Sequence, residues 1–226
     1  LELRRGWGHG MVTALARIEG RPVGIVANNP HHLGGAIDPD AADKGARFMQ
    51  LCNAHGIPLL SLCDTPGFMV GPEVERQAQV RHACRLFVTA AHLQVPVFTV
   101  VVRKGYGLGA QAMAVGGFDA PVFTVAWPTG EFGGMGLEGA VKLGFRKELE
   151  AAAAGPDGER TREALYQQLV ARQYENGSAI NMATTLEIDA VIDPADTRGW
   201  LVRGLNGTGP GRVRSDSDGA RFVDVW

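Results

Sequence analysis

Two glycine-rich segments contain the residues whose types and spacing could support chemistry. The first, Arg103–Ala110 (RKGYGLGA), lies between a strongly apolar run and an Ala- and Met-rich segment. Glycine lets a ligand approach backbone N–H groups closely, and the N–H groups that begin a helix point outward without a partner. Such groups stabilise negative charge on a carbonyl oxygen. The segment therefore predicts either an oxyanion site or a close-packed turn from strand to helix.

The second segment, Gly133–Gly139, has glycines in a G-x-G-x-x-G pattern at Gly134, Gly136 and Gly139. This pattern binds dinucleotides when an acidic residue ends the next strand, about 20 residues further on. The stretch at that distance, Ala151–Gly158, is an alanine run followed by a turn. We therefore do not expect a dinucleotide site.

Other polar residues have structural interpretations. Asp64 follows an apolar run, where ligands of α/β sheets gather, but a carboxylate that caps the following turn is the interpretation we favour. His31 and His32 have no carboxylate or thiolate partner close in sequence, so we expect a plain loop there. Arg103 and Lys104 are equally compatible with phosphate contacts and with a solvated surface.

Composition narrows the class of protein. The 226 residues are 45% hydrophobic and 20% charged, as in ordinary globular domains. The net charge is −2, whereas a nucleic-acid binder usually carries an excess of Lys and Arg. No apolar run is long enough to span a membrane. The chain starts at Leu1 without a signal peptide and reads like the middle of a sequence, so we expect a fragment of a longer protein.

The cysteines indicate a reducing setting. Cys52, Cys63 and Cys84 are far apart and form no C-x-x-C pair, so neither a disulfide framework nor a zinc cluster is expected. Their apolar surroundings predict that all three lie in the core. The cytoplasm is the simplest location.

The elements that must position these residues alternate along the chain. Short apolar runs predict five strands, at Arg21–Asn28, Pro58–Cys63, Pro96–Val102, Pro121–Trp127 and Ile188–Ile192. Helical patterns predict helices over Ala42–His55, from Pro72 to Leu93, from the second glycine segment to Ala154, over Thr161–Glu175 and from Asp193 to Arg203. The alternation indicates an α/β fold with a covered, mostly parallel sheet. We expect one domain over residues 1–205 with a helical C-terminal extension, and a flexible tail over 206–226.

Seven segments, taken in order, resemble one family. They are VGIVANNP, GGAID, KGARF, CDTPGF, VRKGYGLGAQAM, AWPTGEFGGMGLEGAV and IDPADTR. Between Arg4 and Leu201 the chain resembles the C-terminal half of the carboxyltransferase subunit of biotin-dependent acyl-CoA carboxylases, of the propionyl-CoA carboxylase β type. The resemblance implies a crotonase-like fold, in which repeated β-β-α units form two roughly perpendicular sheets surrounded by helices.

The resemblance also implies an activity. Family members transfer a carboxyl group from carboxybiotin, held on a separate carrier, to the α-carbon of an acyl-CoA. The implied partners are an N-terminal carboxyltransferase domain, a biotin carboxylase, a biotin carrier protein and further copies of the subunit, as a dimer or a trimer of dimers. The active site would lie between the N-terminal domain of one subunit and the C-terminal domain of its dimer mate. No metal, nucleic acid or membrane is implied.

The resemblance places an oxyanion hole for the biotin ureido oxygen on the first glycine segment. Two motif comparisons both include Gly109 as a backbone donor, while Leu108 and Ala110 compete for the second donor. Leu108 stands where the family usually has glycine, but a backbone N–H does not need glycine. Gly107 belongs to the same loop and is expected to line the site.

Further binding residues are implied by the same resemblance. Gly34 and Gly35 correspond to the first anion-binding loop of crotonases. Phe68 and Met69 follow the D-x-P-G turn and are expected to wall the biotin entrance. Gln111 lies near a position linked to the choice of acyl chain, where acidic or aliphatic residues are usual.

Alternatives remain open at this stage. A biotin-dependent decarboxylase or transcarboxylase would use the same oxyanion chemistry, so the sequence does not separate it from a carboxylase. The departure at Leu108 also allows a non-catalytic assembly subunit. A hydratase is disfavoured because Gln111 and Met113 stand where a second glutamate is needed, and Glu131 is expected to be structural. We expect the 226 residues alone to be inactive.

Overall fold

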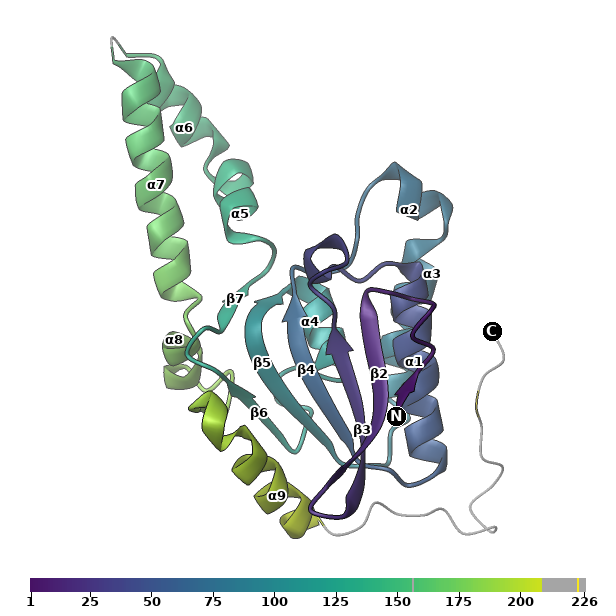
Figure 1. The fold of residues 1–226 in the computed structure, drawn as a ribbon. Coiled ribbons are helices and arrows are strands. Elements are labelled where there is room, and N and C mark those ends of the chain that lie inside the picture. The colour runs from purple at the N-terminus through teal and green to yellow at the C-terminus, as the bar shows by residue number, and fades with distance from the viewer. Residues whose placement is uncertain (156, 209–222, 224–226) are drawn as a thin grey trace.

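The fold is organised around one mixed β-sheet with helices on both faces (Figure 1). A computed structural model describes residues 1–155, 157–208 and 223. The strands are β1 (Glu2–Leu3), β2 (Met11–Ile18), β3 (Arg21–Asn28), β4 (Leu59–Thr65), β5 (Val97–Tyr106), β6 (Phe123–Ala126), β7 (Glu131–Gly133) and β8 (Ala190–Val191). Their order is β1-β2-β3-β4-β5-β6-β8, and β7 pairs with the end of β5. Strands β1 to β3 are antiparallel and the other pairs are parallel, so the prediction of a mostly parallel sheet is confirmed.

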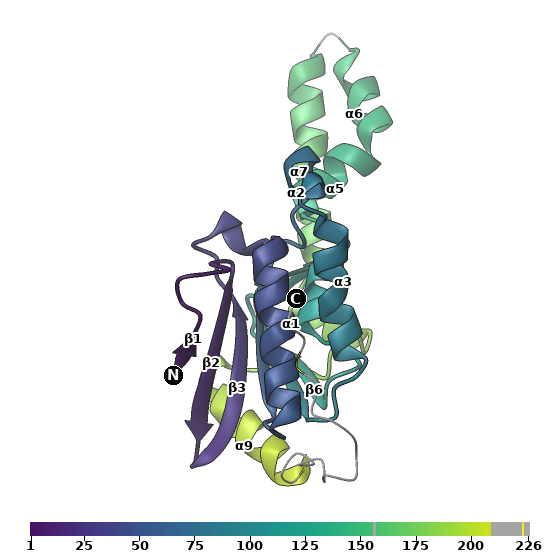
Figure 2. The same ribbon diagram turned by 90° about the vertical axis from the view of Figure 1, so that its right-hand side faces the viewer.

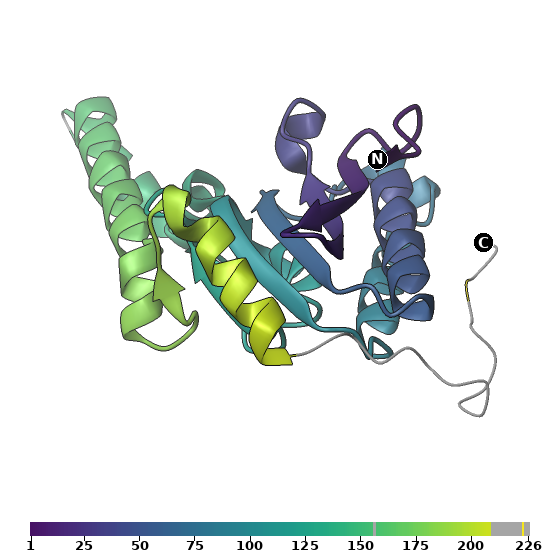
Figure 3. The ribbon, with the colours of Figure 1, turned by 60° about the horizontal axis from the view of Figure 1, so that its bottom comes forward.

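Helices cover the two faces of this sheet and also extend beyond it. They are α1 (Pro39–Ala54), α2 (Pro72–Arg76), α3 (Gln79–Ala90), α4 (Gly107–Met113), α5 (Leu137–Gly144), α6 (Arg146–Ala153), α7 (Gly158–Asn176), α8 (Ala179–Thr184) and α9 (Thr197–Thr208), with short 3₁₀ turns at Leu33–Gly35 and Pro194–Asp196. Helices α1 and α3 lie side by side on one face, and α9 crosses the other (Figures 2 and 3). Helices α5, α6 and α7 project from the body as an arm, drawn in green in Figure 1.

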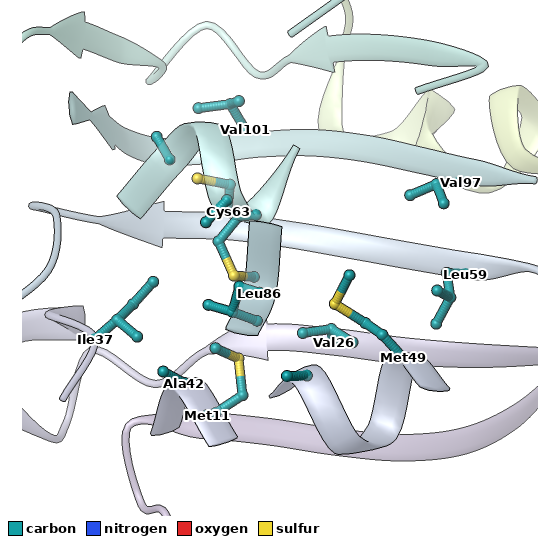
Figure 4. Packing of buried hydrophobic residues seen from close by; sticks show 14 of the residues in the cluster. Met11, Val26, Ile37, Ala42, Met49, Leu59, Cys63, Leu86, Val97 and Val101 are labelled. Atoms are coloured by element: carbon teal, nitrogen blue, oxygen red, sulfur yellow. The ribbon is translucent and has the colours of Figure 1, made fainter. Parts of the chain in front are cut away.

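Alternation along the strands sends apolar side chains into two cores. On β5, Val97 and Val101 face α1, α3 and α4, whereas Phe98 and Val100 face α9. Figure 4 shows the first core, where side chains from β2, β3, β4 and β5 meet those of α1 and α3. In the second core, a Cβ on Gly204 of α9 would lie 2.6 Å from the Phe98 ring. Glycine at 204 therefore lets the helix lie directly on the sheet.

The structure corrects several predicted boundaries. The strand at Arg21–Asn28 is confirmed, whereas β5 continues through Tyr106 instead of ending at Val102. The single helix predicted from Pro72 is two helices, because Ala78 has a left-handed φ of 59° and breaks it. Strands β1, β2 and β7 and helix α8 were not predicted.

Two expectations about architecture also change in detail. All described strands belong to one hydrogen-bonded sheet rather than two perpendicular ones, because β5 pairs with β6 along its first half and with β7 at its end. Helix α9 continues to Thr208, so residues 206–208 are helical, and most of the predicted tail lies outside the described residues. Within the described part of the chain, no helix has both the length and the apolar character that a membrane crossing requires.

Candidate functional site

The first glycine segment forms a direct junction between β5 and α4. Gly107 has a left-handed φ of 58°, and a Cβ there would lie 2.7 Å from the Gly134 carbonyl oxygen, so both conformation and space favour glycine. Tyr106 supplies no side-chain cap, and the first N–H groups of a helix lack partners within it. Leu108 is 63% exposed while Gly109 and Ala110 are buried. The start of α4 therefore borders the surface.

The D-x-P-G turn packs directly against the first turn of α4. A Cβ on Gly109 would lie 2.7 Å from the Cα and carbonyl carbon of Gly67 and 3.0 Å from the Phe68 nitrogen. The turn itself is closed by Thr65, whose Oγ1 accepts from the Gly67 N–H at 3.1 Å. Two segments that are distant in sequence thus form one rigid unit.

Asp64 connects this turn to β5. Its Oδ1 accepts from Arg103 Nε at 3.2 Å and from the Lys104 backbone N–H at 3.1 Å, and its Oδ2 accepts from Arg103 Nη2 at 3.1 Å. The hydrogen bond to Asp64 raises the pKa of Arg103. The prediction that Asp64 caps its own turn is therefore wrong, because the carboxylate is taken up by β5. Arg103 forms an ion pair with Asp64 and also stays exposed to solvent.

The loop at Gly34 and Gly35 adjoins the same unit. Lys104 Nζ donates to the Gly34 carbonyl oxygen at 2.8 Å. A Cβ on Gly35, which has a φ of 92°, would collide with the Asp64 carbonyl oxygen. Gly34 therefore contacts Lys104 of the first glycine segment, and Gly35 lies against the end of β4, just before the D-x-P-G turn closes.

Phe68 and Met69 continue from the turn along this loop. Ile37 N–H donates to the Gly67 carbonyl at 3.0 Å, and Met69 N–H donates to the Ile37 carbonyl at 2.9 Å. The Phe68 ring lies 6.3 Å from that of Phe87 on α3 and packs against the first core. Both Phe68 and Met69 are half-buried, so part of each borders solvent beside α4.

An open pocket of about 400 Å³ lies on the other side of the glycine junction. Gln111, which is exposed, lines it together with Gly107. Phe118, Phe132 and Met182 supply apolar wall, while Gln173, Asn176 and Glu187 add further polar groups. The lining therefore mixes apolar and polar surface and suits a ligand that has both.

The second glycine segment supports the first rather than forming a dinucleotide site. Strand β7 aligns Glu131 with Lys104 and Gly133 with Tyr106. The Tyr106 hydroxyl donates to Glu131 Oε2 at 2.7 Å, and burial, followed by this bond, strongly raises the pKa of Tyr106. Glu131 is not among the residues that line the pocket. Its carboxylate therefore holds the base of the junction, as expected for a structural role.

The remaining candidates divide into paired, buried and exposed groups. His32 Nε2 lies 2.7 Å from Asp38 Oδ2, a partner six residues away that sequence reasoning missed. Cys52 and Cys63 are buried, and burial raises the pKa of each thiol to about 12. Cys84 is exposed, so the prediction of three core cysteines is wrong for that residue, which lies on the outward side of α3. Within the described residues, no three or more His, Cys, Asp or Glu side chains are arranged to hold a metal ion.

Comparison with known proteins gives consistent results. Residues 1–209 match the family model described as carboxyl transferase domain. The chain is 40% identical over 207 residues to the methylmalonyl-CoA carboxyltransferase 12S subunit of Propionibacterium freudenreichii subsp. shermanii, covering 91% of this chain and 38% of that protein. It is 38% identical over 205 residues to the biotin-dependent acetyl-/propionyl-coenzyme A carboxylase beta5 subunit of Mycobacterium tuberculosis, covering 89% and 36%.

Solved structures show the same likeness. A single-chain, multi-domain long-chain acyl-CoA carboxylase superposes with a TM-score of 0.80 at 57% identity, covering 90% of this chain and 19% of that one. The transcarboxylase 12S structure with methylmalonyl-CoA bound superposes with a TM-score of 0.84 at 35% identity, covering 95% and 40%. The chain thus spans well under half the length of the proteins it matches.

Proposed function

Because this chain belongs to the carboxyl transferase domain family, we propose that it forms the C-terminal half of an acyl-CoA carboxyltransferase. The reaction is transfer of a carboxyl group from biotin to the α-carbon of an acyl-CoA. The observation that carries the proposal is the family match over residues 1–209. Family membership also confirms the resemblance seen in the sequence and the crotonase-like α/β fold expected from it.

The start of α4 is the proposed oxyanion hole. Gly109 N–H and the N–H of Leu108 or Ala110 are the donors, aimed at the ureido oxygen of biotin. These groups belong to the first turn, where backbone donors lack helical partners and the helix dipole favours negative charge. Removing one such donor costs about 10²–10³ in rate. The leucine at 108 changes a side chain and leaves the donated N–H in place.

The residues at this junction fit biotin. The Tyr106 side chain does not cap the start of α4, so it does not take up the first backbone N–H groups that biotin would need. Bound biotin supplies the carboxyl group and a basic ring nitrogen for the α-proton. The chain's own residues therefore need only to bind, orient and stabilise charge.

Other residues complete the binding surface in this proposal. Gly34 and Gly35 offer backbone groups beside the D-x-P-G turn, while Phe68 and Met69 form the apolar border of the biotin entrance. Gln111 faces the acyl chain from the mouth of the pocket of about 400 Å³. The 57% identity with a long-chain acyl-CoA carboxylase favours an acyl chain longer than propionyl.

The proposed partners follow from the names of the relatives and from the small share of their length that this chain covers. The M. tuberculosis relative is named as biotin-dependent, and the bacterial 12S structure is described as a hexamer. We infer that this chain works with an N-terminal carboxyltransferase domain, a biotin carboxylase and a biotin carrier, in a homo-oligomer. The free thiols of Cys52, Cys63 and Cys84 agree with a reducing cytoplasm.

The testing experiment uses the full-length protein with its biotin carboxylase and biotin carrier. Carboxylation of acetyl-, propionyl- and palmitoyl-CoA is followed with labelled bicarbonate and ATP. Label in a thioester supports the proposal and identifies the acyl chain. Absence of label from all three, with the assembly intact, refutes a carboxylase.

The likeness to a methylmalonyl-CoA carboxyltransferase supports a second candidate, a transcarboxylase. Such an enzyme takes its carboxyl group from a carboxylated thioester and needs neither ATP nor biotin carboxylase. Transfer of label from methylmalonyl-CoA to the biotin carrier without ATP, combined with no incorporation from bicarbonate, would favour it. No transfer in either assay would leave a non-catalytic assembly subunit.

A further inference from the structure

Leu108 presents an apolar side chain at the first turn of α4, the helix whose start is the proposed oxyanion hole. The side chain is 63% exposed, and it belongs to neither of the two apolar cores of the described chain. Single exposed leucines are common on protein surfaces, so exposure alone assigns no role to this residue. The surroundings of the first turn make its position informative.

The other sides of this turn are covered by protein. A Cβ on Gly107 would lie 2.7 Å from the Gly134 carbonyl oxygen, and a Cβ on Gly109 would approach the D-x-P-G turn equally closely. Ala110 is fully buried in the first core. Because successive residues of an α-helix point about 100° apart, these three residues account for three sides of the turn. The fourth side, where Leu108 lies, is the one that stays exposed.

The Leu108 side chain therefore borders the open approach to the first backbone N–H groups. Side chains of a helix lean toward its N-terminus, so this leucine lies over the helix start, where those N–H groups are. Gln111 follows three residues later on the same helix face and lines the pocket of about 400 Å³. Of the two, Leu108 is nearer to the N–H groups and Gln111 is nearer to the pocket.

We propose that the Leu108 side chain packs against the fused rings of biotin while the backbone of the same turn binds the ureido oxygen. This inference rests on the proposed function, because that function places biotin at the helix start. Biotin offers both surfaces, since its ureido group is polar while its sulfur-containing ring and its alkyl chain are apolar. An apolar cover beside the N–H groups also displaces water, which strengthens their interaction with negative charge. Leu108 is thus a binding residue for biotin and takes no part in proton transfer.

The test compares a ligand of the helix start with a ligand of the pocket. Equilibrium dissociation constants of free biotin and of palmitoyl-CoA are measured for the full-length protein and for its Leu108→Ala variant. Alanine removes three apolar carbon groups, and the loss of their partial burial should weaken biotin binding by about tenfold. Palmitoyl-CoA binding should change by less than about twofold, because Gln111 lines the pocket and Leu108 does not.

Two controls separate apolar contact at this position from general disturbance. Leu108→Met keeps an apolar side chain of similar size and should bind biotin within about twofold of the unaltered protein. Leu143→Ala removes the same atoms from a leucine that is 70% exposed on α5 of the arm, and it should change neither constant. If Leu108→Ala does not fold, Leu108→Asn keeps the approximate size without the apolar surface and should weaken biotin binding in the same way.

Equal weakening of both ligands in Leu108→Ala, or no weakening of either, would overturn the inference. Weaker binding of palmitoyl-CoA alone would overturn it by assigning the side chain to the acyl chain. Dissociation of the full-length assembly in this variant, followed by size-exclusion chromatography, would overturn it by assigning the side chain to a subunit contact. These measurements need no turnover. Failure of the unaltered full-length protein to carboxylate any thioester would instead contradict the proposed function, so the two failures are distinguishable.

Discussion

Replacing Gly109 by alanine tests whether the D-x-P-G turn and the start of α4 act as one unit. The added Cβ would lie 2.7 Å from two backbone atoms of Gly67, while ordinary contact begins at 3.4 Å. The two segments must therefore separate by about 0.7 Å, because backbone on one side and helix on the other cannot rotate away. That displacement exceeds the tolerance of about 0.5 Å within which a preorganised donor works.

The expected effects on rate and stability differ in size. A misplacement of about 1 Å costs about 10² in rate, so kcat/KM for carboxyl transfer should fall by about that factor. Overpacking costs about 1–3 kcal/mol, while alanine gains up to about 1 kcal/mol over glycine inside a helix. The free energy of unfolding should therefore fall by no more than about 3 kcal/mol. Urea unfolding and steady-state kinetics of the full-length complex measure the two quantities.

Gly139→Ala provides the matched control. Gly139 lies inside α5, and a Cβ there would meet only the Met135 side chain, at an ordinary 3.6 Å. The variant should be more stable by up to about 1 kcal/mol and fully active. If Gly109→Ala keeps more than half of the activity at unchanged stability, the contact does not position the donor and the argument fails.

Three further predictions concern other contacts of the fold. Tyr106→Phe should lower the free energy of unfolding by about 1.5 kcal/mol in urea titrations, because it removes the bond to Glu131, and an unchanged midpoint would contradict this. Thr99→Val should raise the free energy of unfolding by about 1 kcal/mol, since the fully buried Thr99 Oγ1 has no hydrogen-bond partner among the described residues. A loss of stability would show that the hydroxyl has a partner. The hydrogen bond from Tyr174 lowers the pKa of Glu138 below its ordinary value of 4.5. The pair therefore stabilises the arm fully at pH values above 4.5, and this stabilisation is lost as the pH falls through the pKa that Glu138 has in the folded protein. The melting-temperature difference between the protein and Tyr174→Phe should therefore shrink on acidification, and a constant difference from pH 7 to pH 3 would contradict the assignment.

The local pattern of apolar residues was sufficient to predict the bounds of elements in which those residues are contiguous. Strand β3 was predicted at its observed bounds because Arg21–Asn28 ends at an Asn-Asn-Pro turn. Strand β2 was missed, since its buried position Thr13 is polar and interrupts the apolar pattern. Helix α1 begins at Pro39, three residues before the expected start, because the Asp38 side chain accepts from the Ala41 N–H at 2.8 Å and caps it.

The glycines of the candidate site could be predicted from the sequence, but the residues that they contact could not. Gly107 and Gly109 were selected because glycine permits close approach of backbone. What they approach, Gly134 and Gly67, depends on how β5, β7 and the turn after β4 are placed relative to one another. Residues that are tens of positions apart in the chain meet only through that tertiary placement, and no spacing rule within one segment contains it.

An irregularity in the strand register explains why Asp64 was misassigned and why two basic side chains reach the loops. Cys63 aligns with Val101, but Thr65 aligns with Gly105, so three residues of β5 stand opposite Asp64 alone. Such an excess interrupts the ladder and leaves backbone groups without strand partners.

Side chains replace the missing ladder bonds at this point. The Asp64 carboxylate accepts from the Lys104 N–H, Asn28 Oδ1 accepts from the Asp64 N–H at 3.0 Å, and Cys63 Sγ lies 3.7 Å from the Lys104 carbonyl. The extra residues of β5 include Arg103 and Lys104, whose side chains leave the regular alternation and reach Asp64 and Gly34. The irregularity is therefore the structural feature that brings the end of an ordinary parallel strand into contact with the loops of the proposed site.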